Sequence, residues 1–222
     1  MLIKTRGIVF RFTRYGDSSL IVTIFTENSG IQSFMVKGIR KNRSGSGMAL
    51  YQPLTLLELV VYNKESAGLQ HIREVRCTHI YSRIPGDMLR ETLAFFITEL
   101  LNKSIREQSQ PEELYRFLEE WLLRLDDEKT ALRNFHLHFM SRLCRYLGFG
   151  ARHTHEITGG RILPDELNLP LQKILDGDEP DMTYQNRKEI LDLFIAFFRE
   201  HVENFGTLKS IDVLQEILSQ KN

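Results

Sequence analysis

The chain has 222 residues, of which 42% are hydrophobic and 26% charged, and these values suit a globular protein of one large or two small domains. The longest apolar runs, such as residues 193–198, are too short to cross a bilayer, and residues 1–6 lack the apolar core of a signal peptide. Only two cysteines occur, Cys77 and Cys144, which is no disulfide framework. We therefore exclude disulfide-stabilised secreted proteins and expect a cytoplasmic protein that does not enter membranes.

The formal net charge is zero, but the charges are unevenly distributed. Residues 1–80 hold 11 Lys and Arg against 5 Asp and Glu, whereas residues 81–222 hold 18 against 24. This asymmetry predicts a basic N-terminal module that meets a polyanion, joined to a module with another task.

The first 80 residues read as short β-type runs separated by turn residues. The runs cover residues 7–12, 19–26, 31–36, 54–62 and 69–77, with turns rich in Gly, Asp, Asn and Ser between them. Five strands with one longer basic connection suit a small closed barrel, and an OB-fold is the leading choice. The expected class is α+β, with an OB-fold over residues 1–80.

Beyond Pro85 the hydrophobic period changes to that of helices. We expect helices over residues 88–105, 111–125, 128–147 and 211–219, with Asp127 as a cap for the third. An irregular linker is expected over about 150–182, with a short helix near 171–175. Asn186 to Glu189 has capping-box spacing ahead of the apolar run 190–198. Residues 81–222 are thus predicted to form one helical domain.

The stretch from Gly30 to Gly47 combines a strand with a dense basic load. Lys37, Arg40, Lys41 and Arg43 fall within seven residues, and no Asp or Glu occurs between Glu27 and Glu58. Such a strand and loop can bind phosphates. A solvated surface loop would have the same composition, so the pattern alone leaves both interpretations open.

Four further residues of the barrel are candidates for DNA contact. Arg6, Arg11 and Arg14 lie in or next to the first run, and a solvated strand edge and a DNA contact are equally compatible with the pattern. Tyr15 sits in a turn beside Arg14 and can offer its ring to a base, or pack on the barrel as turn tyrosines often do.

No motif of a known catalytic site is present, so we expect no enzymatic activity. His136 and His138 are two residues apart on a predicted helix and face different directions, which makes them a poor metal pair. His153 and His155 fall short of the four ligands of a structural zinc site. We therefore expect no cofactor, and surface or packing roles for these histidines.

The order of residues in the first half resembles the RecO family of bacterial recombination mediators. The resemblance rests on the segments YGDSSLIV, FTENSG and VKGIRK, which begin at Tyr15, Phe25 and Val36, and on Ser44. It continues more loosely through residues 135–139, 147–149 and 209–214. Many members of this family carry a four-cysteine zinc motif after the LGF segment, whereas residues 152–163 here hold no cysteine. The resemblance therefore implies a degenerate, zinc-less module at this place.

The resemblance further implies an N-terminal OB-fold, a helical C-terminal domain and no turnover. It implies binding of single- and double-stranded DNA, annealing of complementary strands, and work with RecR to load RecA onto DNA coated by single-strand-binding protein (SSB). The acidic, hydrophobic-ended tail of SSB would bind to arginines of the helical half, and the candidates are Arg133, Arg142 and Arg145. Ordinary surface positions on a helix fit these three residues equally well. An OB-type RNA-binding or translation accessory protein and a protein–protein adaptor remain as alternatives.

Overall fold

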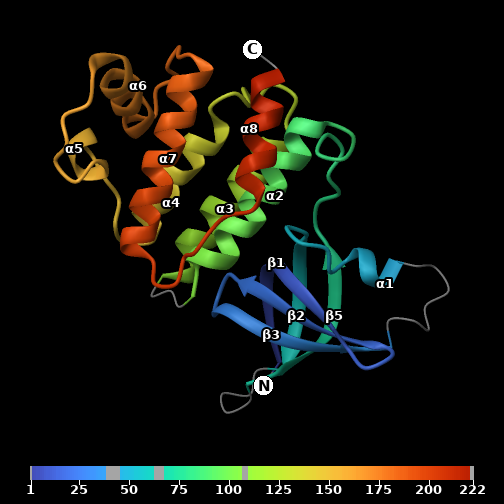
Figure 1. Cartoon of the computed structure of the whole chain (residues 1–222). Coiled ribbons are helices and arrows are strands. Elements are labelled where there is room, and N and C mark those ends of the chain that lie inside the picture. Colours follow the sequence, from blue (N-terminus) through green and yellow to red (C-terminus); the bar gives the residue numbers. More distant parts are fainter. Residues whose placement is uncertain (1, 39–45, 63–67, 107–109, 221–222) are drawn as a thin grey trace. The chain divides into compact units, whose positions relative to one another are not determined.

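The computed structural model describes residues 2–38, 46–62, 68–106 and 110–220. The chain forms two compact units (Figure 1). The first contains residues 1–82 and 106–124, and the second contains residues 83–105 and 125–222. The predicted division at residue 80 stays a prediction, and the grouping of residues 106–124 with the first unit was not anticipated.

Five strands form the closed barrel of the first unit. They are β1 (Leu2–Tyr15), β2 (Ser19–Thr26), β3 (Gly30–Lys37), β4 (Leu56–Tyr62) and β5 (Gln70–Cys77), in the order β1-β2-β3-β5-β4. All pairs are antiparallel except β3 with β5, which is parallel. This arrangement confirms the predicted five-stranded OB-fold and the α+β class.

Alternation along the strands places the barrel core. Leu20, Val22 and Ile24 of β2 are buried in it together with Phe34 of β3 and Leu59 of β4. Their neighbours in sequence point to the outer surface, so the period of two that predicted the strands also separates interior from exterior.

Two helices accompany the barrel. The short α1 (Ser46–Ala49) lies between β3 and β4, and the longer α3 (Pro111–Asp126) contributes residues 111–124 to the first unit. Arg6 of β1 joins α3 to the barrel, because its guanidinium binds Glu119 at 2.7 Å and lies 4.8 Å from the ring centroid of Tyr115. α3 is therefore packed on the barrel of the first unit.

In the described residues of the second unit there are six helices. They are α2 (Met88–Ser104), α4 (Phe135–Tyr146), α5 (Thr154–Ile157), α6 (Asp165–Asp176), α7 (Tyr184–His201) and α8 (Ser210–Gln220). α2 packs with α8, while α4, α6 and α7 pack with one another (Figure 1). Fully buried side chains such as Leu93, Phe96, Phe194 and Phe198 fill the core between them. None of the helices in the described part of the chain is long and apolar enough to span a membrane.

Two helix starts differ from the sequence-based expectation. α4 begins at Phe135 and not at residue 128, because Asp127 accepts a hydrogen bond from the amide of Lys129 at 3.4 Å and forms a turn. α7 begins at Tyr184 with Thr183 as its cap, whose hydroxyl accepts from the amide of Asn186 at 3.1 Å. The predicted capping box at Asn186 therefore lies inside the first turn. In the linker predicted to be irregular, α5 and α6 are regular, and α6 is longer than the short helix expected there.

Candidate nucleic-acid interface

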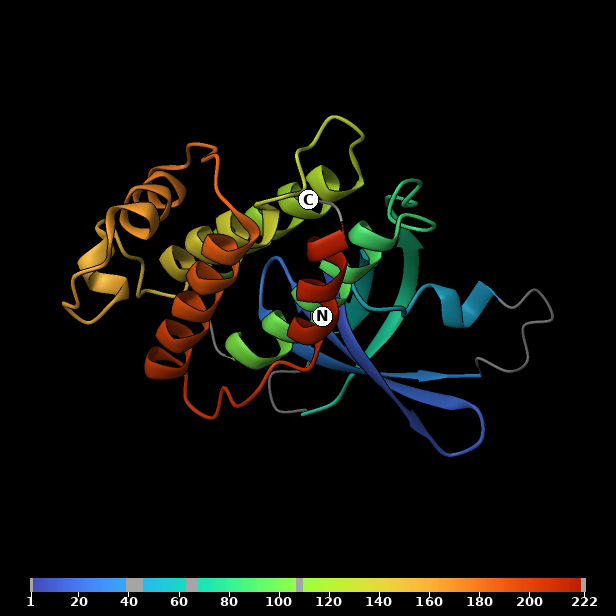
Figure 2. The ribbon, with the colours of Figure 1, turned by 45° about the horizontal axis from the view of Figure 1, so that its top comes forward.

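The strand register brings Tyr15 and Lys37 to one end of the barrel. Tyr15 pairs with Ser19 of β2, and Ser19 pairs with Lys37 of β3, so the three residues form one row across three strands. The hairpin that joins β1 to β2 projects from the barrel beside the end of β3 (Figure 2). Tyr15 and Lys37, which the sequence pattern proposed separately, thus lie in one row with only β2 between them.

The outer face of this three-stranded ribbon continues from that row. Because side chains alternate between the two faces, the second outer row contains Thr13, Ile21 and Met35. The third outer row contains Arg11, Thr23 and Ser33, and there the Arg11 Nε donates to the Thr23 hydroxyl at 3.4 Å. Tyr15 is 58% exposed, and Ile21 and Met35 are half-buried. A face of aromatic, apolar, hydroxyl and cationic groups can take the bases and phosphates of a single strand.

Ile21 and Met35 were not among the residues proposed from the sequence. The period of two in β2 and β3 was a sufficient signal to find them, since it assigns both residues to the same outer face as Tyr15 and Lys37.

Arg14 lies on the other side of β1 from Tyr15. It pairs with Leu20, whose side chain is buried in the core, yet Arg14 itself is exposed because it lies at the end of the barrel. Arg11 and Arg14 therefore lie on opposite faces of β1. Asp17 in the hairpin turn is also exposed and reduces the local positive charge.

The cations of the barrel divide into a paired and an unpaired set. In the described residues, Arg11, Arg14 and Lys37 have no carboxylate partner. The remaining described cations of the barrel strands all have one: Lys4 and Arg76 bind Glu58 at 3.0 and 2.8 Å, Arg73 binds Glu74 at 3.4 Å, and Arg6 binds Glu27 and Glu119. These three cations lie on β1 and β3, with Arg14 and Lys37 at the hairpin end and Arg11 two outer rows further along.

Arg6 differs from the other proposed DNA-binding residues. Its hydrogen bonds raise its own pKa and lower that of Glu27, in each case chiefly through the pairing between the two side chains. With both carboxylates within 2.7 Å, the guanidinium joins β1 to the rest of the first unit. Arg40, Lys41 and Arg43 of the predicted set lie outside the described residues.

The arginines proposed for the helical unit do not form one group. Arg142 and Arg145 lie in the second half of α4, facing the C-terminal end of α6, where Arg145 donates to the carbonyl of Leu175 at 2.7 Å. Arg133 precedes α4 and lies near Arg187, whose pKa is lowered by burial and, to a smaller extent, by the charge of Arg133. Arg152, which the sequence gave no reason to select, joins Arg142 and Arg145 instead.

The histidines take the separate orientations that the sequence predicted. His136 is completely buried against Phe96, with ring centroids 6.3 Å apart, while His138 faces Glu179 at 3.1 Å. His153 and His155 stack on each other at 5.6 Å. Within the described residues, no group of three or more His, Cys, Asp or Glu side chains is placed to hold a metal ion.

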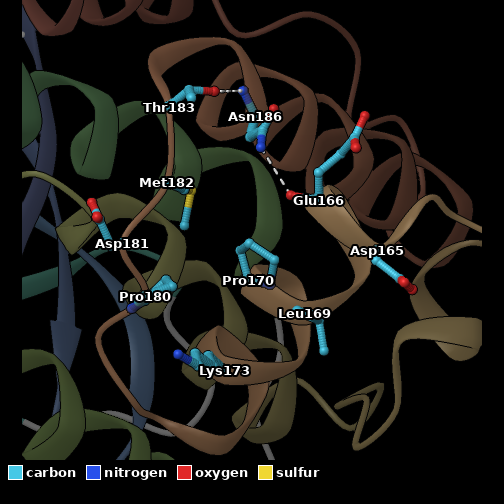
Figure 3. Close-up of a pocket in the computed structure, with 10 residues that line it drawn as sticks. All are labelled: Asp165, Glu166, Leu169, Pro170, Lys173, Pro180, Asp181, Met182, Thr183 and Asn186. Atoms are coloured by element: carbon cyan, nitrogen blue, oxygen red, sulfur yellow. Dashed lines mark hydrogen bonds between the residues drawn. The ribbon is translucent and has the colours of Figure 1, made fainter.

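A hollow in the surface of the helical unit has the opposite charge to the hairpin end of the barrel. It is formed by α6 and the segment that leads into α7, and Asn186 fixes its rim by donating to the carbonyl of Glu166 at 2.9 Å (Figure 3). Its charged lining residues are Asp165, Glu166, Asp181 and Lys173. Three carboxylates against one ammonium group make this surface unsuited to a phosphate backbone.

Comparison with known proteins identifies the family over most of the chain. Residues 1–81 match the family model described as "Recombination protein O N terminal", and residues 85–209 match "Recombination protein O C terminal". The DNA repair protein RecO of Bacteroides fragilis is 32% identical, with 98% of this chain and 99% of that protein covered. The RecO proteins of Flavobacterium psychrophilum and Christiangramia forsetii are 31% and 29% identical over nearly their whole lengths. The chain belongs to the RecO family of DNA repair proteins.

Proposed function

We propose that this chain is a non-enzymatic recombination mediator that binds single- and double-stranded DNA through its barrel. In this role it anneals complementary strands and works with RecR to load RecA onto SSB-coated DNA. Membership of a DNA repair family supports the general role. The barrel surface supports the mode of binding.

One observation carries the DNA-binding proposal: the described strand cations without a carboxylate partner all lie on β1 and β3, in the ribbon that also exposes Tyr15. The other described cations of the strands each have a carboxylate partner. A phosphate that approaches Lys37 or Arg11 meets a full positive charge, with no protein carboxylate to displace. Arg40, Lys41 and Arg43 follow Lys37 within six residues of the sequence, so we include them in the DNA-binding proposal.

Annealing follows from charge neutralisation. Two complementary strands repel each other through their phosphates, and cations bound along one or both strands reduce that repulsion. Release of condensed counterions drives the binding, so no nucleotide hydrolysis is required. Bases that rest on a tolerant aromatic and apolar face remain free to pair with an incoming strand.

We assign the protein partners to the helical unit, whose net charge is negative. Of the three arginines predicted for the SSB tail, we keep Arg133 for this role and treat Arg142 and Arg145 separately below. We expect the protein to act in the cytoplasm, associated with the nucleoid.

The test is an annealing assay with complementary oligonucleotides coated with SSB. The wild-type protein should accelerate annealing without ATP, and replacement of Lys37, Arg40, Lys41 and Arg43 by Ala should abolish most of the acceleration. A preference for structured RNA would favour an RNA-binding accessory protein. Failure to bind either nucleic acid would favour an adaptor.

A further inference from the structure

A cationic pocket of about 880 Å³ opens in the helical unit, on the side of α4 that faces the end of α6. α4 contributes Arg145, the segment after α4 contributes Arg152 and His153, and α6 contributes Gln172 and Asp176. The apolar lining residues Ala151 and Leu175 are 3% and 1% exposed, so the accessible walls are polar.

Arg145 and Arg152 line this pocket, and Arg142 lies beside it, next to Gly177. Partial burial and the positive charges of Arg142 and Arg152 lower the pKa of Arg145, while Asp176 opposes the effect. Neither Arg142 nor Arg152 makes a side-chain hydrogen bond or ion pair in the part of the chain that the structure describes. Like charges held together in this way are unfavourable unless an anion joins them.

The surrounding backbone holds the arginines in place. The amide of Arg152 donates to Glu156 at 2.6 Å, and its carbonyl accepts from Gln172 at 3.0 Å, so the base of this side chain is fixed. Gly177 ends α6 in the left-handed region at φ 95°, and a Cβ there would lie 2.3 Å from an Arg142 nitrogen. A glycine at this place leaves room for the Arg142 guanidinium beside the pocket.

The nearby carboxylates do not cancel the charge. Glu156 is engaged by the backbone amides of Arg152 and His153, at 2.6 and 2.8 Å. Asp176 accepts a hydrogen bond from Gln172 at 3.0 Å and remains the carboxylate of the pocket lining. The two lining arginines and the adjacent Arg142 outnumber these two carboxylates, which leaves a positive surplus.

We propose that this pocket binds a phosphate of a nucleic-acid strand and gives the chain a second phosphate-binding surface, on the unit that does not contain the barrel. The inference rests on the proposed DNA binding and extends it. Guanidinium groups are well suited to phosphate oxygens, and the volume exceeds that of a single phosphate group. An acidic tail with a hydrophobic end fits less well, because the apolar lining residues are buried and offer that end no surface.

The experiment measures binding of a fluorescent oligothymidine by anisotropy at several salt concentrations, using the full-length protein. Arg152→Ala removes one exposed cation and should lower the salt slope by about 0.7, the value for one phosphate contact on a single strand. Arg152→Glu should lower it further, and Arg152→Lys should restore most of it. Lys173→Ala is the matched control, because it removes a cation from α6 at the acidic hollow (Figure 3) and should leave the slope unchanged.

The possible outcomes separate the two proposals. If the wild-type protein binds DNA with a salt-dependent affinity and Arg152→Ala and Arg152→Glu both keep the wild-type slope, the pocket proposal fails while the proposed function stands. If the wild-type protein does not bind DNA, the proposed function itself fails. Loss of affinity for an acidic, hydrophobic-ended peptide in Arg152→Ala, with DNA binding intact, would reassign the pocket to a protein tail. Thermal unfolding of each variant checks that the fold is retained.

Discussion

The buried histidine of the helical unit should make the protein sensitive to mild acid. His136 is completely buried, and both ring nitrogens lack a hydrogen-bond partner among the described residues. Burial, with smaller contributions from Arg187 and His138, lowers its pKa to about 3 from an ordinary value of 6.5. The folded protein therefore holds this ring neutral over a range in which the unfolded chain protonates it.

The sign and the size of the effect follow from proton linkage. Between pH 6.5 and about 3 the unfolded state binds one more proton than the folded state at this residue, so stability falls as the pH decreases. At pH 5 the contribution is about 2 kcal/mol, since 1.5 pH units below the unfolded pKa cost about 1.4 kcal/mol each. Above pH 7 the contribution vanishes.

The perturbation is His136→Phe, which keeps a planar ring but cannot bind a proton. Urea unfolding of both proteins at pH 7.5 and pH 5.0 gives four free energies, and other titrating groups cancel in the double difference. We expect the wild-type protein to lose about 2 kcal/mol more than the variant between the two pH values. At pH 7.5 the variant should be close to the wild type or more stable, because it removes two unsatisfied buried polar atoms. An equal loss in both proteins would show that His136 is not buried in its neutral form.

Three further predictions follow from the sites described above. Arg6→Ala should reduce stability at pH 7 by roughly 1–3 kcal/mol, because it leaves Glu27 and Glu119 without their partner. Pairing with Arg6 lowers the pKa of Glu27, so the difference in stability between the two proteins should shrink as the pH falls below about 4.5. Urea unfolding at pH 7 and pH 4 measures this difference. Tyr15→Phe should leave affinity for a single strand nearly unchanged, whereas Tyr15→Ala should weaken it by about 1–3 kcal/mol if a base stacks on the ring; equal affinities by anisotropy would contradict stacking. The purified protein should contain no stoichiometric zinc, and a chelator should leave its melting temperature unchanged; about one zinc per chain in elemental analysis would assign His153 and His155 a metal-binding role.

The barrel was predictable from sequence because local signals agree with the tertiary structure. β-branched and aromatic runs of period two, separated by Gly- and Asp-containing turns, define the strands and their inner faces without reference to distant residues. The row of Tyr15, Ser19 and Lys37 adds only the hairpin register, which the turns set.

The features that were missed depend on contacts between distant residues. In the sequence, nothing distinguishes Arg6 from the other basic residues near it. In the structure it donates a hydrogen bond to the carboxylate of Glu119, which is 113 residues away in the sequence. The helical period of α3 marks a buried face but not the barrel as its neighbour. Arg152 has no sequence signal at all, since its position beside α4 depends on how the chain returns after Gly148 to meet α6.

The predicted first residues of α4 and α7 were wrong for a more local reason. Asp127 and Asn186 are both good capping residues, and sequence alone cannot distinguish a residue that caps a helix from one that closes a turn or lies within the first turn. In the structure Thr183 takes the capping role for α7 and Asp127 stabilises a turn. Competition between neighbouring polar side chains decided both cases.

In our proposal, the cations of β1 and β3 without a carboxylate partner hold the phosphates of DNA. The most direct measurement is the salt slope of single-strand binding for two variants of equal charge: Arg11, Arg14 and Lys37 replaced by Ala, and the ion-paired Lys4, Arg73 and Arg76 replaced by Ala. Three lost contacts should reduce the slope by about 2 in the first variant, and its annealing rate should fall with it. The second variant should keep a slope close to that of the wild type. An equal reduction in both variants, or no reduction in the first, would contradict the account.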